Sequence, residues 1–325
     1  MKLAETDTVR RAGRGSRHHV RRARYTRPQA RRTCNRGVEV RVPAISEYFK
    51  TVGEWDDGVH RFRVITPDHA DWLTGLAELY RELRTASRVP IGDLGLTGLE
   101  GFDVEDLQAA LVATQVPTRH SGSPKVKHMA VERSDIGELV LALIGELKYG
   151  YNYGYRSVRD RELVKLPGRG IDQIGVLELD LTNGERAYVL SLGEAKVSID
   201  KNSPPAVVDG SKDCLRVQHR GHLTESAESI QKVLGAARHT ADRDTARQLF
   251  AAGMLWRQGS DKVTLRSTSM LVRDRNHQPT DFGSFRASPS DYDPGHIDFT
   301  ILVIDTGDIE ELVDEFLALA RQEAA

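Results

Sequence analysis

The sequence is poor in several features that define whole classes of protein. Only Cys34 and Cys214 are cysteines among its 325 residues, so a disulfide framework is excluded and a reducing, cytoplasmic location is expected. No apolar run reaches the roughly 18 residues that cross a bilayer, and the first residues lack the apolar core of a secretory signal. We therefore expect no membrane association. The 39% hydrophobic and 29% charged residues are instead typical of a soluble chain with one large or two modest domains.

The net charge of −1 conceals an uneven distribution of charge along the chain. Residues 1–36 contain eleven Arg and one Lys against two acidic residues, which leaves about −11 for the rest of the chain. Such a basic segment is either a tether for nucleic acid or a simple extension of the chain. Because it has almost no apolar residues with which to form a core, we predict a disordered basic arm over residues 1–37.

Hydrophobic periodicity predicts ordered structure from Val38 onwards. The Ser-, Gly- and Pro-containing segment 120–127 has the composition of a linker. We therefore predict an N-terminal α/β region over residues 38–127 and a second domain over residues 128–325. The strand and the two helices predicted in the first region cover residues 59–65, 71–83 and 103–114.

The second domain begins with an amphipathic helix, predicted over Ser134–Lys148. Ser134 is a competent N-cap, and a continuous apolar stripe runs from Ile136 to Leu147. The tyrosine-rich segment 149–155 that comes next is predicted to be a loop. Beyond a central hairpin, the remaining predicted helices and strands cover residues 224–234, 240–256, 262–273, 296–305 and 308–320.

The most informative stretch runs from Gly170 to Ser198, which the pattern predicts as two strands joined by a tight turn. Asp172 opens the first strand, and Glu194 and Lys196 lie near the end of the second. Residues two apart in a strand point to the same face, so Glu194 and Lys196 project together. Two carboxylates and a lysine at a strand end can hold a hard divalent cation and stabilise a negatively charged reacting group.

The turn of this hairpin decides whether the two carboxylates can meet. The Asn-Gly pair at 183–184 is typical of a two-residue type I′ turn, which would turn Asp172 away from Glu194. A three-residue loop with Gly184 in the left-handed conformation would place Asp172 directly opposite Glu194 instead. Because a shared site requires the second arrangement, we predict a three-residue loop over residues 182–184.

Asp172, Glu194 and Lys196 form an Asp-(x)n-Glu-x-Lys pattern that resembles the motif of the PD-(D/E)XK nuclease superfamily. The predicted order of helix, hairpin, Glu-x-Lys strand and helix is similar to the core order of that superfamily. A more specific resemblance, over roughly residues 55–320, is to the HamA nuclease subunits of the Hachiman anti-phage defence systems. The motifs that carry it are Ser-Asp-Ile-Gly-Glu (134–138), Gly-Arg-Gly-Ile-Asp (168–172) and Gly-Glu-Ala-Lys-Val-Ser (193–198).

This resemblance implies an α/β fold with a restriction-endonuclease-like PD-(D/E)XK core, in which helices flank a mixed central sheet. It also implies Mg²⁺- or Mn²⁺-dependent cleavage of DNA, by a subunit that acts with a HamB-like helicase partner. Asp172, Glu194 and Glu138 would then bind the metal. Lys196 would orient or help to deprotonate the attacking water and stabilise the pentavalent phosphate.

For the helix carboxylate, resemblance and periodicity disagree. At about 100° per residue, Glu138 lies opposite the apolar stripe of its helix. If that stripe packs on the sheet, Glu138 points away from Asp172, and Asp135 or Glu146, nearer the edge of the stripe, are the alternatives. The resemblance favours Glu138.

Other interpretations remain open. The chain could be a catalytically silent nucleic-acid-binding or scaffolding subunit with the same fold, although Asp, Glu and Lys are all present. A Glu-x-Lys strand can also be a surface strand with cross-strand ion pairs, which would bind no metal. The spacing of His219 and His222 suggests zinc, but with only Cys214 nearby the ligand count is too small. We therefore predict that both histidines are polar residues preceding a helix.

Overall fold

The computed structural model describes residues 48–86, 103–118, 131–160, 170–305 and 308–322. The predicted arm over residues 1–37 and the predicted boundary between residues 127 and 128 both lie outside these ranges. For the described residues, the α/β class predicted from the sequence is confirmed.

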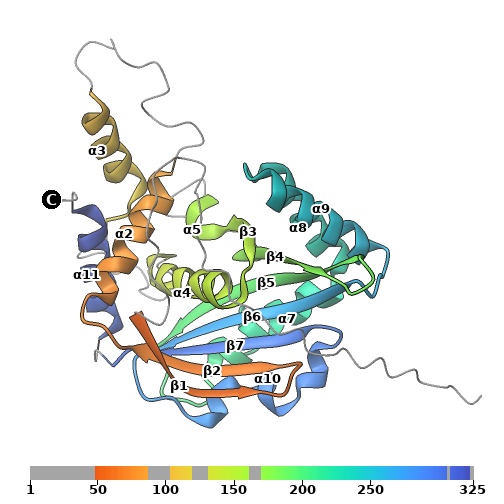
Figure 1. Cartoon of the computed structure of the whole chain (residues 1–325). Coiled ribbons are helices and arrows are strands. Elements are labelled where there is room, and N and C mark those ends of the chain that lie inside the picture. The colour runs from red at the N-terminus through yellow and green to blue at the C-terminus, as the bar shows by residue number, and fades with distance from the viewer. Residues whose placement is uncertain (1–47, 87–102, 119–130, 161–169, 306–307, 323–325) are drawn as a thin grey trace, which may run out of the picture. The chain divides into compact units, whose positions relative to one another are not determined.

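The described residues form one mixed seven-stranded sheet with the strand order β1-β2-β7-β6-β5-β4-β3 (Figure 1). Strands β2, β7, β6 and β5 are parallel to one another, whereas β1, β4 and β3 pair in antiparallel fashion. The strands are β1 (Phe49–Asp56), β2 (Arg61–Pro67), β3 (Asn152–Arg156), β4 (Gln173–Asp180), β5 (Arg186–Ser198), β6 (Val263–Arg273) and β7 (His296–Val303).

The sheet includes strands from the N-terminal part of the chain as well as from the later part. The strand predicted over residues 59–65 is β2, which pairs with β7. Strand β1 was not predicted, because it is an edge strand whose side chains after Phe49 are mostly exposed. An exposed edge strand has no buried face, so its sequence need not alternate between apolar and polar residues.

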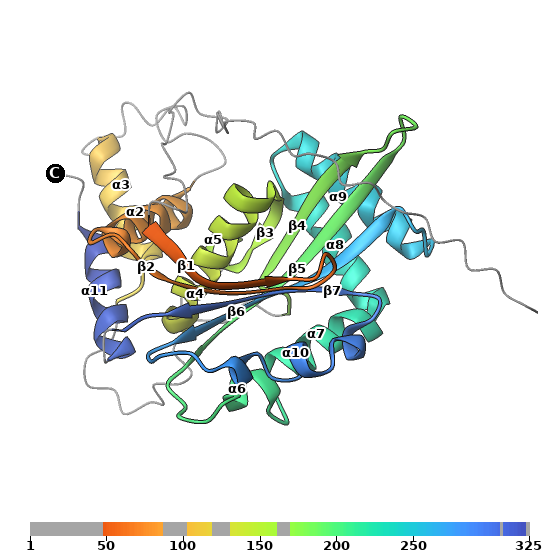
Figure 2. The same cartoon turned by 60° about the horizontal axis from the view of Figure 1, so that its bottom comes forward.

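Helices cover both faces of the sheet (Figure 2). On one side, α4 (Val131–Leu143) lies across the strands, continues as the π-helical turn η3 (Ile144–Lys148), and packs with α2, α5 and α11. The other elements on this side are α2 (Trp72–Thr85), α3 (Val104–Gln115) against α2, α5 (Ser157–Asp160) and α11 (Ile309–Arg321). The opposite side carries α6 (Ala206–Asp209), α7 (Leu215–Thr224), α8 (Ser226–His239), α9 (Arg243–Arg257), η4 (Pro279–Phe282), α10 (Ser284–Ala287) and η5 (Pro289–Tyr292).

A separate apolar core therefore lies on each side of the sheet. Burial of these side chains supplies most of the driving force for folding, at roughly 25 cal/mol per Å² of apolar surface. Fully buried members on the α4 side include Leu76, Val140, Val313 and Phe316, and on the other side Val64, Leu271, Phe285, Phe299, Val233 and Leu249.

The two faces can be assigned residue by residue from α4. A Cβ atom on Gly137 would lie 3.1 Å from Val272 and 3.4 Å from Ala195, so α4 approaches β5 and β6 closely at this glycine. Because side chains alternate along a strand, Ala195 faces α4, whereas Glu194 and Lys196 project from the other face. Helix α7 lies on that other face.

Several predicted elements are confirmed, among them α2, α3, α9, β6, β7 and α11. Asp103 caps α3 and Asp308 caps α11, each accepting a hydrogen bond from a backbone N–H in the first turn. Two predictions were wrong. Helix α4 already includes Val131, so Ser134 lies inside the helix and is not its N-cap. The tyrosine-rich segment 149–155 is not all loop, because most of it belongs to β3, which pairs with β4.

The three-residue loop predicted for the central hairpin is confirmed. The Leu181 N–H donates to the Glu185 carbonyl at 2.8 Å, and Asp180 pairs with Arg186. Gly184 has φ = +77°, in the left-handed region. The same register runs back to the pair Gln173–Gly193. Just before that pair, the Asp172 N–H donates to the Gly193 carbonyl at 3.0 Å, and Oδ2 of Asp172 accepts from the Ala195 N–H at 3.1 Å, which brings this carboxylate beside Glu194.

The left-handed glycine of this loop can be tested by substitution. We expect Gly184→Ala to lower the free energy of unfolding by about 1 kcal/mol, because a left-handed φ is unfavourable for a residue with a Cβ atom. Nothing lies within 4 Å of that Cβ, so the cost is conformational only. The matched control is Gly235→Ala inside α8, where the Cβ is equally free and alanine should stabilise by about 0.5–1 kcal/mol. Urea denaturation measures both, and equal effects of the two substitutions would contradict the loop conformation.

Candidate functional site

The structure brings Asp172 and Glu194 together at the start of the β4–β5 hairpin. Asp172 immediately precedes β4, and its Oδ2 accepts a hydrogen bond from the Ala195 N–H at 3.1 Å. Glu194 is almost completely buried, with 1% of its surface exposed, whereas Asp172 is half-buried. The two carboxyl groups interact directly with each other.

Both carboxyl groups are held in surroundings that disfavour negative charge. Burial raises the pKa of Glu194 to about 7, with a smaller opposing effect from the charge of Lys196. Burial and then the charge of Glu194 raise the pKa of Asp172 well above its ordinary value. Desolvation is thus the main reason that both groups resist ionisation, and at Asp172 the like charge of Glu194 adds to it.

Lys196 lies two residues beyond Glu194 on the same face of β5, as predicted. Its side chain is half-buried, and its charge lowers the pKa of both Asp172 and Glu194. Among the described residues it forms no ion pair within 4 Å. The ammonium group is therefore near the carboxylate pair and available to a further negatively charged group.

Glu138 approaches this pair from α4. It is buried, accepts a hydrogen bond from the Ser157 hydroxyl, and raises the pKa of Glu194 through its charge. Its backbone carbonyl accepts a hydrogen bond from the side chain of Gln173, the first residue of β4. Glu138 thus lies close enough to act on Glu194 electrostatically, but on the α4 side of the sheet.

The helical-wheel orientation of Glu138 assumed that the apolar stripe of α4 packs on the sheet. Gly137 and Leu141 lie against the sheet, and the apolar stripe shares one core with residues of β5 and β6. Because α4 is buried nearly all round, Glu138 is buried as well, although it lies opposite the stripe. The alternative carboxylates have other partners, since Asp135 accepts a hydrogen bond from Tyr80 at 2.8 Å and Glu146 pairs with Arg156.

His222 is a site residue that was not predicted from the sequence. Its Nε2 lies 2.9 Å from Oε1 of Glu194, and the ring is buried in α7. Burial lowers the pKa of His222 to about 4, so at neutral pH the ring is uncharged and its Nε2–H can donate to the ionised Glu194. The prediction that His219 and His222 precede a helix was wrong. Their spacing of three residues was the available signal, because it places both rings on one side of a helix.

Lys232 is a second residue that was not predicted. A Cβ atom on Gly170, which has φ = +96°, would collide with the ammonium group of Lys232. Lys232 pairs with Glu228 at 2.7 Å, and its charge lowers the pKa of both Glu194 and His222. Gly170 therefore leaves room for a second ammonium group beside the carboxylate pair.

The described residues contain no group of three or more His, Cys, Asp and Glu side chains arranged to hold a metal ion. The carboxylates of the site are instead a pair, Asp172 and Glu194, whereas Glu138 lies on α4 and acts on Glu194 through its charge. Among the helices that the structure describes, none is long and apolar enough to cross a membrane.

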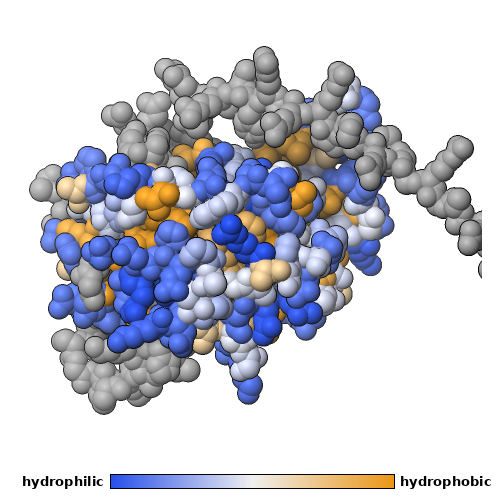
Figure 3. All heavy atoms as spheres, turned by 90° about the horizontal axis from the view of Figure 1, so that it is seen from below, coloured by the Kyte–Doolittle hydropathy of each residue, from blue (hydrophilic) through white to orange (hydrophobic). Residues whose placement is uncertain are grey.

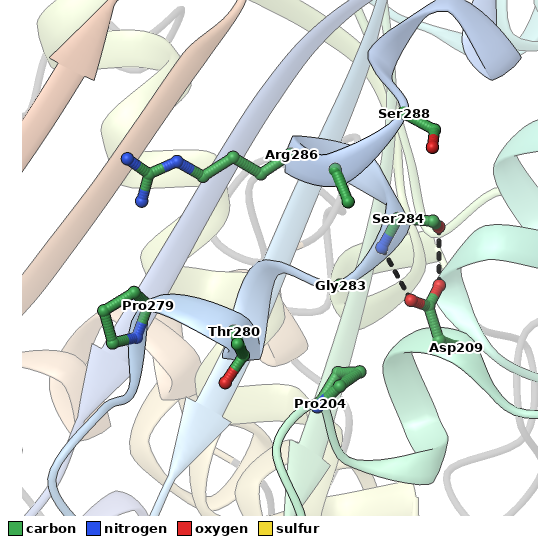
Figure 4. A pocket seen from close by; sticks show the side chains of 9 residues that line it. Pro204, Asp209, Pro279, Thr280, Gly283, Ser284, Arg286 and Ser288 are labelled. Atoms are coloured by element: carbon green, nitrogen blue, oxygen red, sulfur yellow. Dashed lines mark hydrogen bonds between the residues drawn. The ribbon is translucent and has the colours of Figure 1, made fainter.

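The molecule also has a pocket away from this site, of about 550 Å³ (Figure 4). Asp209 accepts hydrogen bonds from the backbone N–H and the hydroxyl of Ser284, each at 2.6 Å, and Arg286 points away from that carboxylate. No predicted site residue lines this pocket. The surface seen from below is mainly hydrophilic, with apolar residues interspersed (Figure 3).

The comparisons with known proteins identify no family. No family model matches the sequence, and no curated protein matches it significantly. Function is therefore inferred from the geometry of the site.

The burial of Glu194 predicts a pH-dependent stability in the metal-free protein. Its pKa rises from 4.5 in the unfolded chain to about 7 in the fold. The contribution of Glu194 to the free energy of unfolding is therefore complete below pH 4.5 and is lost as the pH rises through 7. The full effect is about 3 kcal/mol. His222, with its pKa lowered from 6.5 to about 4, acts in the opposite direction and loses its contribution as the pH falls through 4.

The variant Glu194→Gln separates the pH-dependent contribution of Glu194 to stability from that of His222. In EDTA, its free energy of unfolding relative to the wild type should increase progressively between pH 4.5 and pH 7, because glutamine cannot ionise. Denaturant titrations at several pH values measure this difference. A difference that stays constant with pH would contradict the burial of an ionisable Glu194.

Proposed function

We propose that this protein is a metal-dependent nuclease that hydrolyses phosphodiester bonds of DNA and has a PD-(D/E)XK core. The observation that carries the proposal is the direct contact of the Asp172 and Glu194 carboxyl groups at the end of the β4–β5 hairpin, with Lys196 on the same face of β5 as Glu194. The order of α4, the hairpin and the subsequent helices, together with the mixed sheet, is compatible with that core.

The donor set suits a hard divalent cation, Mg²⁺ or Mn²⁺. Mg²⁺ commonly takes one or two carboxylates and fills its other positions with water and substrate phosphate, so the pair Asp172 and Glu194 is sufficient on the protein side. Glu138 would support the site from α4. When bound, such an ion lowers the pKa of water and offsets the charge that develops on the phosphate.

The remaining roles depend on where the side chains lie. Lys196 would orient the attacking water and stabilise negative charge on the reacting phosphate. His222 would hold Oε1 of Glu194 in place by its hydrogen bond of 2.9 Å. Burial of Glu194 keeps bulk water from competing for its carboxylate.

We further propose that the chain is the effector subunit of an anti-phage defence complex, as the resemblance to the HamA subunits implies. A HamB-like helicase would deliver or restrain it. The charge distribution supports a need for such a partner, because the chain after residue 36 carries about −11. A body of that charge attracts the DNA polyanion poorly.

The test is a plasmid cleavage assay of the purified chain, and of the complex recovered from its host by affinity capture, with Mg²⁺, Mn²⁺ or EDTA. We expect cleavage that needs the metal, with weak activity in the isolated chain and stronger activity in the complex. If neither preparation cleaves DNA and Mg²⁺ leaves the melting temperature unchanged, the chain is the silent scaffolding or nucleic-acid-binding subunit instead.

A further inference from the structure

A second cluster of ionisable side chains lies at the amino ends of the parallel strands. Arg266 in β6 is the ladder partner of His296, the first residue of β7. The ring of His296 lies 6.3 Å from that of His60, which precedes β2. Arg61, the first residue of β2, contributes its charge to the same group.

Arg266 is the unusual member of this cluster. Only 7% of its surface is exposed, and its Nη1 donates a hydrogen bond of 3.3 Å to the Val59 carbonyl. Among the described residues, no carboxylate lies within ion-pair distance of Arg266. Arginine is almost never this buried without a negatively charged partner, because desolvation of the charge is costly.

The carboxylates of the neighbourhood are engaged by other arginines. Asp298 lies 3.5 Å from Arg63 and 3.9 Å from Arg61, and Asp56 lies 3.4 Å from Arg61. Asp293 influences His296 electrostatically but is exposed. Within the described ranges of the chain, the charge of Arg266 thus has no carboxylate in direct contact.

His60 presents a hydrogen-bond donor rather than a further acceptor. Nδ1 of His60 accepts the N–H of Ile297 at 3.2 Å, so the proton of the neutral ring is on Nε2. Burial, followed by the charge of Arg266, lowers the pKa of His296. An anion bound here would reverse the effect of those neighbouring cations and favour the protonated ring.

This cluster is separate from the carboxylate site. Arg266 pairs in register with Ser191 of β5, three residues before Glu194, so Arg266 projects from the α4 face and Glu194 from the other. Helix α4 itself crosses farther along the strands, over Met270 and Val272 (Figure 1).

We propose that Arg266, His296 and His60 form a binding site for a phosphate group. A guanidinium group presents parallel N–H donors that match two phosphate oxygens, and the imidazole N–H groups can supply further donors to the remaining oxygens. The phosphate belongs either to a small free anion or to a nucleic-acid backbone. This proposal does not depend on the proposed nuclease function.

Binding is measured on the full chain in EDTA, so cleavage plays no part in the readout. Isothermal titration and thermal melting use two probes, inorganic phosphate and a short single-stranded DNA without terminal phosphates. We expect at least one probe to bind, and Arg266→Gln to weaken that binding about tenfold or more, since a charge-assisted hydrogen bond contributes strongly. Binding of inorganic phosphate points to a free anion, and binding of the DNA alone points to a backbone phosphate.

Two further variants make the result decisive. Arg238→Gln removes the same charge from an exposed position on α8 and should leave binding within about twofold of the wild type. His296→Gln serves if Arg266→Gln fails to fold, and it too should weaken binding. The proposal is overturned if neither probe binds the wild type, or if Arg238→Gln reduces binding as much as Arg266→Gln does.

Discussion

Replacing Lys196 by alanine is expected to reduce metal-dependent DNA cleavage at least about 100-fold, with little change in stability. The ammonium group stands beside the carboxylate pair without an ion-pair partner within 4 Å among the described residues, and without it the pKa of both carboxyl groups rises further, so that they can stay protonated in the metal-free protein. Loss of one group that stabilises charge in the transition state typically costs 10²- to 10³-fold in rate. Initial rates of plasmid nicking at saturating Mg²⁺ measure the effect.

The carboxylates call for isosteric replacements, because Glu194 is buried and hydrogen-bonded to His222. Asp172→Asn and Glu194→Gln keep the size of each side chain while removing its charge. We expect each to abolish cleavage and to remove any rise in melting temperature on adding Mg²⁺.

A suitable control is Lys262→Ala, which removes a lysine paired with Glu185 at the other end of the hairpin. Exposed pairs of this kind contribute about 0–1 kcal/mol, and the variant should cleave DNA like the wild type. Full activity in Lys196→Ala, Asp172→Asn or Glu194→Gln would overturn the role assigned to that residue.

The second large effect is expected at His222, as a positioning residue for Glu194. His222→Ala removes the donor at 2.9 Å that holds Oε1 of Glu194. Groups that orient a metal-binding carboxylate are commonly responsible for about 10- to 100-fold in metal affinity or activity. We therefore expect the Mg²⁺ concentration needed for half-maximal cleavage to rise by that factor, more than the maximal rate falls.

His222→Gln provides a rescue, because the glutamine amide can place a donor near the former Nε2. It should restore most of the Mg²⁺ dependence, which a purely structural role for the ring would not predict. His219→Gln is the matched control on the same helix, since His219 contacts Ser269 at 2.9 Å and not Glu194. If His219→Gln shifts the Mg²⁺ dependence as much as His222→Ala does, the positioning role is contradicted.

Much of the fold could be predicted because its signals are local. Asp103 and Asp308 mark helix starts through hydrogen bonds within one turn, and the alternation that begins at Val263 and Leu265 in β6 and the apolar run of β7 mark strands. Strand β1 gave no such signal, because most of its side chains face solvent. The tyrosines of β3 were mistaken for a loop, because Gly and Asn between them mask the strand pattern.

The β4–β5 hairpin was predicted only in part from local signals. Asn183-Gly184 by itself favours a two-residue turn, and the three-residue loop was predicted only from the requirement that Asp172 and Glu194 share a face. The structure has that loop. The parity of the hairpin residues left two turns open, and the requirement for a shared site selected the loop that the structure has.

The sequence alone determined that Asp172, Glu194 and Lys196 lie at the same end of one hairpin, and that Glu194 and Lys196 share a face, because the strands are joined by a short turn and side chains alternate with a two-residue period. Only the tertiary structure decided what surrounds them. His222 reaches Glu194 from a helix 28 residues away, Lys232 fits above Gly170, and α4 approaches β5 and β6 closely at Gly137. These placements depend on how helices pack across the sheet, where many side-chain contacts distant in sequence act together and no local pattern records the result.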